Sequence, residues 1–176
     1  RQFKTEQGYN NAINIHCTLL PYLPTSGELK TKPSQHSVQV LRSYGLQPEV
    51  LVCRTSKPIP KNEKEKLALF CSVPKTSVIE CRDMKSIYEV PLALEEQNFA
   101  NVVLKHLLTP EKEADLESWK DLENSIEDID VLYELYTEGE TSIIDDLKEH
   151  YLLLEEKVNT FELKLILSDK HDINNA

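Results

Sequence analysis

Apolar residues in the first two-thirds of the chain alternate between short runs and longer amphipathic stretches. The short runs are rich in apolar and β-branched residues and predict strands at residues 13–20, 50–53 and 77–81. The longer stretches predict helices at residues 33–44, 62–71 and 91–108. Because strands and helices alternate with short links, the pattern predicts an α/β fold with a mostly parallel sheet.

The first predicted helix has recognisable ends and one apolar face. Pro33 can occupy its first turn, and Gly45 can end it. Val38 and Leu41 are expected to face inward, with Val40 as a further candidate. The helix would therefore begin within a lysine-containing segment.

Apolar residues in the last third of the chain follow a different rule, with alternating steps of four and three. The first series is Leu122, Ile126, Ile129, Tyr133 and Tyr136, and the second is Leu147, Tyr151, Leu154, Val158, Phe161 and Leu165. This spacing is typical of the seam between packed helices. With Gly139 as a break between the two series, the pattern predicts an antiparallel helical hairpin over residues 119–167.

Charge supports a division into two units. Residues 1–118 carry a net charge of +1, whereas residues 119–176 carry −11. All nine prolines and all four cysteines lie at or before Pro110. We therefore expect domains at residues 1–118 and 119–176. The acidic second domain argues against nucleic-acid binding through that part, because phosphates would be repelled.

The positions of the cysteines and histidines indicate what class of protein this is. Cys17, Cys53, Cys71 and Cys81 form no CxxC pair and lie in or beside apolar runs, which predicts reduced core thiols in a cytoplasmic protein. The five histidines are scattered, so we expect no metal cage built by the protein.

No apolar run approaches the ~18 residues of a membrane span. Because the chain does not begin with Met, we expect a fragment or a processed start.

The segment with the clearest chemical potential is residues 27–37, Gly-Glu-Leu-Lys-Thr-Lys-Pro-Ser-Gln-His-Ser. Lys30, Lys32 and a row of hydroxyl and amide side chains lie where a helix should begin. A helix start presents N–H groups and the positive end of its dipole, so this segment could cradle a triphosphate. A lysine-rich turn that is only solvated is the more common explanation, and residue types alone leave both open.

The same segment resembles the Lys-Thr-Lys-Pro-Thr-Gln-His-Ser sequence of CTP synthases, with Ser34 in place of Thr. The flanking stretches that also resemble the family are residues 20–22, 26–28, 46–48, 53–54, 68–71, 86–91 and Trp119. The resemblance covers about residues 1–120, and it identifies residues 1–118 as the C-terminal part of the synthetase (amidoligase) domain. It implies a partial P-loop-type parallel sheet with flanking helices.

CTP synthases make CTP from UTP, ATP and ammonia derived from glutamine, through phosphorylation of the uracil 4-oxygen. The resemblance implies that a UTP or inhibitory CTP triphosphate is contacted across a subunit interface of a homotetramer by Lys30, Thr31, Lys32, Pro33, Ser34, Gln35 and Lys66. It also implies that Arg82, Asp83 and Met84 contact the adenine of ATP. Without the resemblance, Lys66 would be interpreted as a solvated helix lysine and residues 82–84 as a turn after a strand.

The parts of the family that carry its chemistry do not occur in this sequence. These are the glycine-rich phosphate-binding loop, the acidic Mg²⁺ ligands and the glutaminase domain with its Cys, His and Glu. Phosphoryl transfer depends on positioned phosphates and Mg²⁺. We therefore expect a CTP synthase fragment that retains the pyrimidine-nucleotide-binding segment, has no catalytic residue or metal ligand, and is inactive alone.

Residues 121–176 resemble the N-terminal helical domain of bacterial peptide chain release factor class 2. The matching stretches are residues 132–135, 154–157, 161–168 and 172–176. The resemblance implies a junction between unrelated coding sequences near Trp119. It also implies an alternative function, in which a non-enzymatic helical module contacts the ribosome. An acidic hairpin of no assigned function is the third alternative.

Overall fold

The protein is described here by a computed structural model, in which residues 1–126 and 148–157 are placed. The chain divides into two compact units, Arg1–Ala114 and Asp115–Ala176. Within the described ranges, no helix combines the length and the apolar character that crossing a membrane requires.

Three parallel strands form the main sheet of the first unit. They are β1 (Ile15–Leu19), β4 (Val50–Thr55) and β5 (Val78–Arg82), in the order β1-β4-β5. In the register of the sheet, Cys17 lies opposite Val52, and Val52 lies opposite Ile79. The central strand is mostly buried, as expected for a strand that pairs on both sides. The prediction of a parallel sheet with flanking helices is therefore confirmed.

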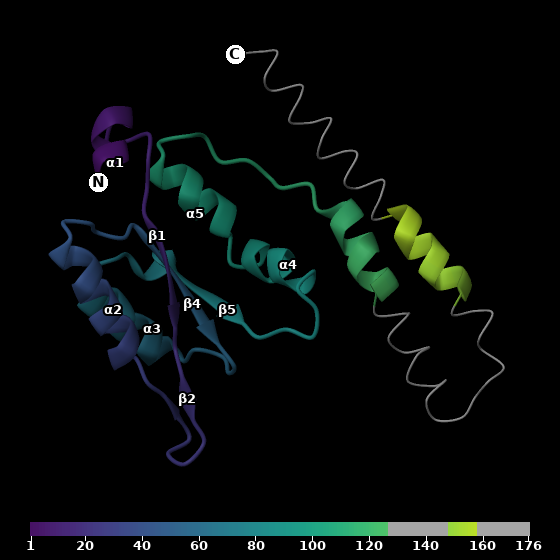
Figure 1. Cartoon of the computed structure of the whole chain (residues 1–176), viewed down its shortest axis with the longest axis horizontal. Helices are drawn as coiled ribbons and strands as arrows, with labels where there is room; N and C mark the ends of the chain where they lie inside the picture. The colour runs from purple at the N-terminus through teal and green to yellow at the C-terminus, as the bar shows by residue number, and fades with distance from the viewer. Residues whose placement is uncertain (127–147, 158–176) are drawn as a thin grey trace. The chain divides into compact units, whose positions relative to one another are not determined.

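Two helices cover one face of this sheet and form the core with it. Helix α2 (Lys32–Ser43) connects β1 to β4, and helix α3 (Lys61–Cys71) connects β4 to β5 (Figure 1). The core cluster comprises Leu20, Leu29, Val38, Leu51, Cys53, Ile59, Leu67, Ala68, Cys71, Val73 and Val78. Hence α3 and the central strand provide much of the buried apolar surface that stabilises the unit.

Helix α2 agrees with most of its prediction. Pro33 lies in its first turn, and Gly45, with φ of 75°, follows its end. Val38 is fully buried and Leu41 is half-buried. Val40 is 41% exposed, so its candidacy for the inward face is wrong. A residue two positions from Val38 lies well around the helix from it, which explains the difference.

A small hairpin that the sequence did not predict lies between β1 and α2. Strands β2 (Tyr22–Leu23) and β3 (Glu28–Leu29) pair antiparallel, and Gly27 lies between them with φ of 65°. Each strand has two residues, which is too short to produce a recognisable alternation of apolar and polar positions. The hairpin places Leu29 in the core and leads directly into the lysine segment.

The helix predicted over residues 91–108 is wrong as one element, because two helices occupy this region. Helix α4 (Glu89–Glu95) and helix α5 (Phe99–His106) are separated at Asn98, whose φ is 57°. The Gln97 side-chain amide donates to the Glu80 carbonyl at 2.7 Å, and its oxygen accepts from the Glu80 N–H at 2.8 Å. Gln97 thus occupies the outer edge of β5 directly before the break at Asn98.

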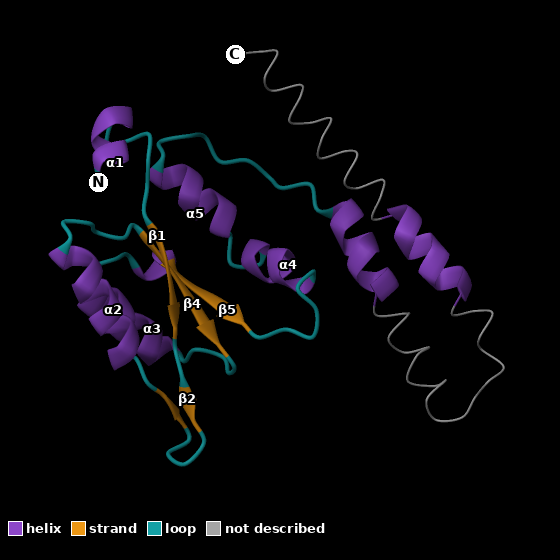
Figure 2. Ribbon diagram, viewed as in Figure 1, coloured by secondary structure: helices purple, strands orange, loops and turns teal. Residues whose placement is uncertain are grey.

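The second pair of helices lies on the side of the sheet opposite α2 and α3 (Figure 2). Helix α4 contacts β5 and α5, yet neither α4 nor α5 contains a fully buried residue. Two further elements of the first unit were not predicted: helix α1 (Gln2–Gln7) and the 3-10 helix η1 (Lys75–Ser77).

All four cysteines are free thiols, but they do not share one environment. Cys53 and Cys71 are buried in the core, and Cys81 is half-buried. Cys17 is exposed, so the expectation that every cysteine lies in the core is wrong for this residue. Its strand is at the edge of the sheet, and it faces the side that α2 does not cover.

In the second unit, residues 117–126 and 148–157 are helical. Lys157 connects the two stretches, because its ammonium donates to the Ser125 hydroxyl at 2.5 Å and to the Asp121 carbonyl at 3.5 Å. Leu122 is buried, whereas Tyr151 is 63% exposed and does not fit the predicted seam. Ile126 and Leu154, which also belong to the predicted seam, are half-buried. The other seam residues and the Gly139 break lie outside the described residues, so the antiparallel hairpin stays a prediction.

Candidate functional site

The carboxyl ends of the three parallel strands meet at one edge of the sheet, and the segments that follow them carry the predicted nucleotide residues. Residues 30 and 31 directly precede α2, residues 32–35 form its first turn, and residues 82–84 lie at and after the end of β5. The Asp83 N–H donates to the Thr55 carbonyl at 2.9 Å, which fixes this turn to the end of β4. In open α/β sheets, ligands bind outside this edge.

The lysine segment forms the start of α2, and two of its hydroxyl groups hold that start in place. Ser34 is fully buried, and its Oγ donates to the Leu19 carbonyl at 3.0 Å and accepts from the Thr18 hydroxyl at 3.2 Å. Thr31 is 2% exposed and accepts from the Gln35 amide at 3.1 Å. Ser34 therefore anchors α2 to β1 and Thr31 braces the first turn, which leaves the backbone N–H groups of that turn as potential ligand donors.

Lysine residues from two elements gather beside this helix start. The Lys30 ammonium pairs with the Glu28 carboxylate, and the hydrogen bond from Lys30 lowers the pKa of Glu28 below its ordinary value. The positive charge of Lys66, on α3, makes a smaller contribution to the same lowering. Lys66 also lies 3.5 Å from Glu63, one turn earlier in α3. The charge of Lys66 thus acts on the same carboxylate that Lys30 pairs with, although the two lysines are distant in the sequence.

The remaining predicted residues of the segment differ in exposure. Lys32 and Pro33 are exposed on the first turn of α2, and Gln35 is half-buried. Lys32 makes no ion pair with any residue in the described ranges, so its charge is available to an anion. Lys32 is therefore the member of the segment whose side chain is best placed to meet a ligand from solvent.

Sequence reasoning missed Lys57, which lies in the loop between β4 and α3. Its ammonium is 5.9 Å from the centroid of the Tyr22 ring, a distance at which a cation and an aromatic face attract each other. The fully buried Thr55 fixes the loop, since its hydroxyl donates to the Lys57 carbonyl at 2.9 Å. The sequence did contain a sign of this residue, because Lys57 lies two residues after the end of β4, which contains an apolar run.

The predicted adenine-contacting residues form a separate group. The Asp83 carboxylate accepts from Arg54 at 2.8 Å, and this hydrogen bond raises the pKa of Arg54. Arg82 lies 3.0 Å from Glu80, and both Arg82 and Met84 line a cavity of about 150 Å³. Among the described residues, no hydrogen bond or ion pair joins this group to Lys30 or Lys66. Arg54 and Glu80 were not predicted as members of this group. They are identified only by their ion pairs with Asp83 and Arg82 in the structure.

The described residues do not build a magnesium site. Magnesium prefers carboxylate and other oxygen ligands, several of which must converge on the ion. Nowhere in the described part of the chain do three or more His, Cys, Asp or Glu side chains come together in this way. The Mg²⁺ that the family resemblance implies therefore does not fit these residues alone, and we assign it no role in what they do.

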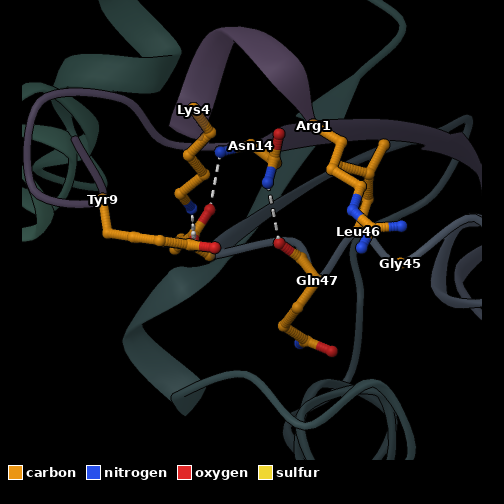
Figure 3. Close-up of a pocket in the computed structure, with 8 residues that line it drawn as sticks. Arg1, Lys4, Tyr9, Asn14, Gly45, Leu46 and Gln47 are labelled. Atoms are coloured by element: carbon orange, nitrogen blue, oxygen red, sulfur yellow. Dashed lines mark hydrogen bonds and ion pairs between the residues drawn. The ribbon is translucent and has the colours of Figure 1, made fainter. Parts of the chain in front are cut away.

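A larger cavity lies away from all predicted site residues, at the edge where the strands begin. Its volume is about 420 Å³, and its lining residues are Arg1, Lys4, Tyr9, Asn14, Gly45, Leu46, Gln47 and Glu49 (Figure 3). Because β1 and β4 are parallel, Asn14 and Glu49, which precede them, are at the edge opposite the lysine group.

Comparison with known proteins gives a consistent result for this fold and site. Residues 1–109 match the family model described as the CTP synthase N-terminus. A CTP synthase from Halalkalibacterium halodurans is 47% identical over 146 residues, covering 83% of this chain and 27% of that protein. One from Methanocaldococcus jannaschii is 48% identical over 156 residues, covering 89% and 28%. One from Bacillus subtilis is 46% identical over 129 residues, covering 73% and 24%.

These alignments also bear on how far the resemblance extends. The match of 156 residues has to include residues beyond 120, where we expected the likeness to end. The release-factor resemblance of residues 121–176 and the junction near Trp119 receive no support and stay predictions. The chain spans about a quarter of the length of these curated relatives. On the extent of the family match and the level of identity, the chain belongs to the CTP synthase family.

Proposed function

We propose that this chain forms the pyrimidine-nucleotide-binding part of a CTP synthase and binds the triphosphate of UTP or CTP at the carboxyl edge of its sheet. The observation that carries the proposal is the placement of Lys30, paired with Glu28, and of the exposed Lys32 at the start of α2. Two ammonium groups and a helix start form a suitable environment for a polyanion.

Some residues of this site would contact the phosphates, and others would hold the start of α2 in place. Lys32, which is exposed and unpaired within the described ranges, would meet the phosphates directly. Lys30 would exchange its present partner, the Glu28 carboxylate, for a phosphate oxygen. Thr31 and Ser34 would act through their backbone N–H groups, because their hydroxyls already hold α2 in place.

We also assign residues 82–84 to the adenine of ATP, as in the family. The turn is held by the bond from the Asp83 N–H to Thr55, and Met84 lies at the cavity beside β5. The residues of both groups can bind and orient nucleotides, but none is placed to transfer a phosphoryl group or a proton. We therefore propose that residues 1–176 alone bind nucleotide without forming CTP, and that the pyrimidine site is completed across a homotetramer interface.

Calorimetric titration of UTP into the chain, with Lys32→Ala as the variant, tests the proposal. Loss of one charged hydrogen bond to phosphate should weaken binding roughly tenfold or more. Lys105→Ala is the matched control, since Lys105 is also an exposed helix lysine but lies on α5. We expect the control to bind UTP as the unmodified chain does.

Three results would count against the proposal. Equal UTP affinity of the unmodified chain and Lys32→Ala would remove the lysine segment from the site. Equal losses in Lys32→Ala and Lys105→Ala would indicate a general charge effect. Formation of CTP by residues 1–176 with ATP, UTP and ammonium would show that this part of the enzyme is active by itself.

A further inference from the structure

The cavity at the amino edge of the sheet has polar walls that come from three parts of the chain. Arg1 and Lys4 belong to the α1 region, Asn14 precedes β1, and Gly45 and Gln47 follow α2. Tyr9 reaches in from one side and Arg1 from the other, with Lys4 and Asn14 between them (Figure 3). The volume of about 420 Å³ lies in the range of sites that hold small organic ligands.

Part of this wall is already paired within the protein. The Glu49 carboxylate accepts from the Lys4 ammonium with one oxygen and from the Asn14 N–H, at 2.6 Å, with the other. The side chains of Lys4 and Glu49 are only 15% and 24% exposed, so this pair is well shielded from solvent. The Asn14 amide nitrogen donates to the Gln47 carbonyl at 3.0 Å. The negative charge of Glu49 is thereby offset, and the paired groups form a fixed floor.

Two donors on the wall remain unused by the described residues. The Arg1 guanidinium has no hydrogen-bond or ion-pair partner there, and neither does the Tyr9 hydroxyl. A Cβ atom added at Gly45 would lie 3.4 Å from Arg1 Nη1, so the missing side chain of Gly45 makes room for the guanidinium. Tyr9 is 74% exposed, which leaves its ring available for stacking. With Lys4 and Glu49 offset, Arg1 gives the cavity a net positive charge.

We propose that this cavity is a second binding site, for a small organic anion in which a carboxylate or phosphate group is attached to a flat ring. Arg1 would bind the anionic group through its forked N–H donors, a geometry that matches both carboxylate and phosphate. The Tyr9 ring would stack on the flat part and its hydroxyl would donate to the anion. This site is independent of the proposed nucleotide site, which lies at the opposite edge of the same strands.

The test is an amide-resolved NMR titration of the full chain with phenyl phosphate and, separately, with benzoate. We expect both probes, or one of them, to shift the amide signals of Asn14, Gly45 and Leu46, and benzyl alcohol to leave them unchanged. Which probe binds more tightly distinguishes a phosphate from a carboxylate ligand. Arg1→Gln should weaken binding roughly tenfold or more, because one charged, forked contact is lost.

Arg1→Lys and Lys112→Gln complete the design. Arg1→Lys keeps the charge without the forked donors and should bind with intermediate affinity, whereas Lys112→Gln, at an exposed lysine outside the cavity, should bind normally. The absence of shifts at millimolar probe, equal binding by Arg1→Gln, or shifts confined to residues 30–35 would each overturn the proposal. Failure of this site would leave the UTP titration with Lys32→Ala unaffected.

Discussion

The two faces of the three-stranded sheet differ in how fully they are covered. On the face packed against α2 and α3, Leu51 and Cys53 are completely buried. On the other face, Ile79 of β5 is also buried, but Ile15 and Leu19, which belong to the edge strand β1, are 40% and 60% exposed. The helices on that side, α4 and α5, contain no fully buried residue.

This difference places the candidate nucleotide site on the better-packed side of the molecule. Lys32 begins α2 and Lys66 lies on α3, so both cations belong to helices that share the core. Binding groups on rigid elements lose little freedom when a ligand arrives. We expect perturbations of the α2–α3 face to affect stability and nucleotide binding strongly, and perturbations of the α4–α5 face to affect both weakly.

The largest contrast should come from core truncation. Leu67→Ala removes a fully buried side chain of α3 and should lower the free energy of unfolding by about 2–5 kcal/mol. Val103→Ala, on α5, removes a half-buried side chain and should cost about 1 kcal/mol. Urea unfolding followed by circular dichroism measures both values. Similar losses in the two variants would mean that the faces contribute equally to the core.

The pH dependence of the free energy of unfolding should show the next-largest difference between the two faces. Burial raises the pKa of the Cys53 thiol to about 12, whereas an unfolded thiol titrates near ~8.5. Between these values the unfolded chain has lost the proton that the folded chain retains. The free energy of unfolding should therefore fall as pH rises above about 9, by up to ~1.4 kcal/mol per pH unit from this thiol.

The matched variants for this titration are Cys53→Ala and Cys17→Ala, which alter the covered and the exposed face respectively. Unfolding in urea at pH 8, 9, 10 and 11 should show a shallower decline for Cys53→Ala than for the unmodified chain. Cys17→Ala should retain the steeper decline. An unchanged slope in Cys53→Ala would show that burial of this thiol does not govern the alkaline loss of stability.

A smaller effect is expected where α2 is anchored to β1. Ser34→Ala removes the donor to the Leu19 carbonyl and the acceptor for Thr18, both inside the protein. Leaving these groups unpaired should cost about 1–3 kcal/mol. Ser37→Ala, which loses a bond to His16 at 2.9 Å on the same helix, is the comparison variant. Because Ser37 is only half-buried, we expect it to cost less, and the reverse order would contradict the anchoring role of Ser34.

The parts of the fold that the sequence predicted are those determined by local pattern. The run at Val50–Thr55 is apolar enough to identify a central strand, and Pro33 with Gly45 marks the ends of α2. Features that depend on distant contacts were missed. The break between α4 and α5 follows directly after Gln97, whose side chain bonds to the backbone of Glu80 on β5. No pattern within residues 91–108 contains that information.

The same distinction applies to the candidate site. The lysine segment could be found from its residue types at a helix start, and the family resemblance added Lys66 and residues 82–84. The support given by Ser34, the pairing of Asp83 with Arg54, and the position of Lys57 over Tyr22 appear only when separate elements are brought together. Side-chain chemistry suggested what could bind, whereas tertiary packing decides which groups are free to do so.

The most direct test of the central claim is an amide-resolved NMR titration of the chain with UTP. If the carboxyl edge binds the triphosphate, the signals of Thr31, Lys32 and Ser34 at the start of α2, together with Lys66 on α3, should shift with one common affinity. Signals of α5 should stay in place. Saturating UTP that leaves the start of α2 unperturbed, or that shifts only residues at the amino edge, would contradict the assignment of this edge as the nucleotide site.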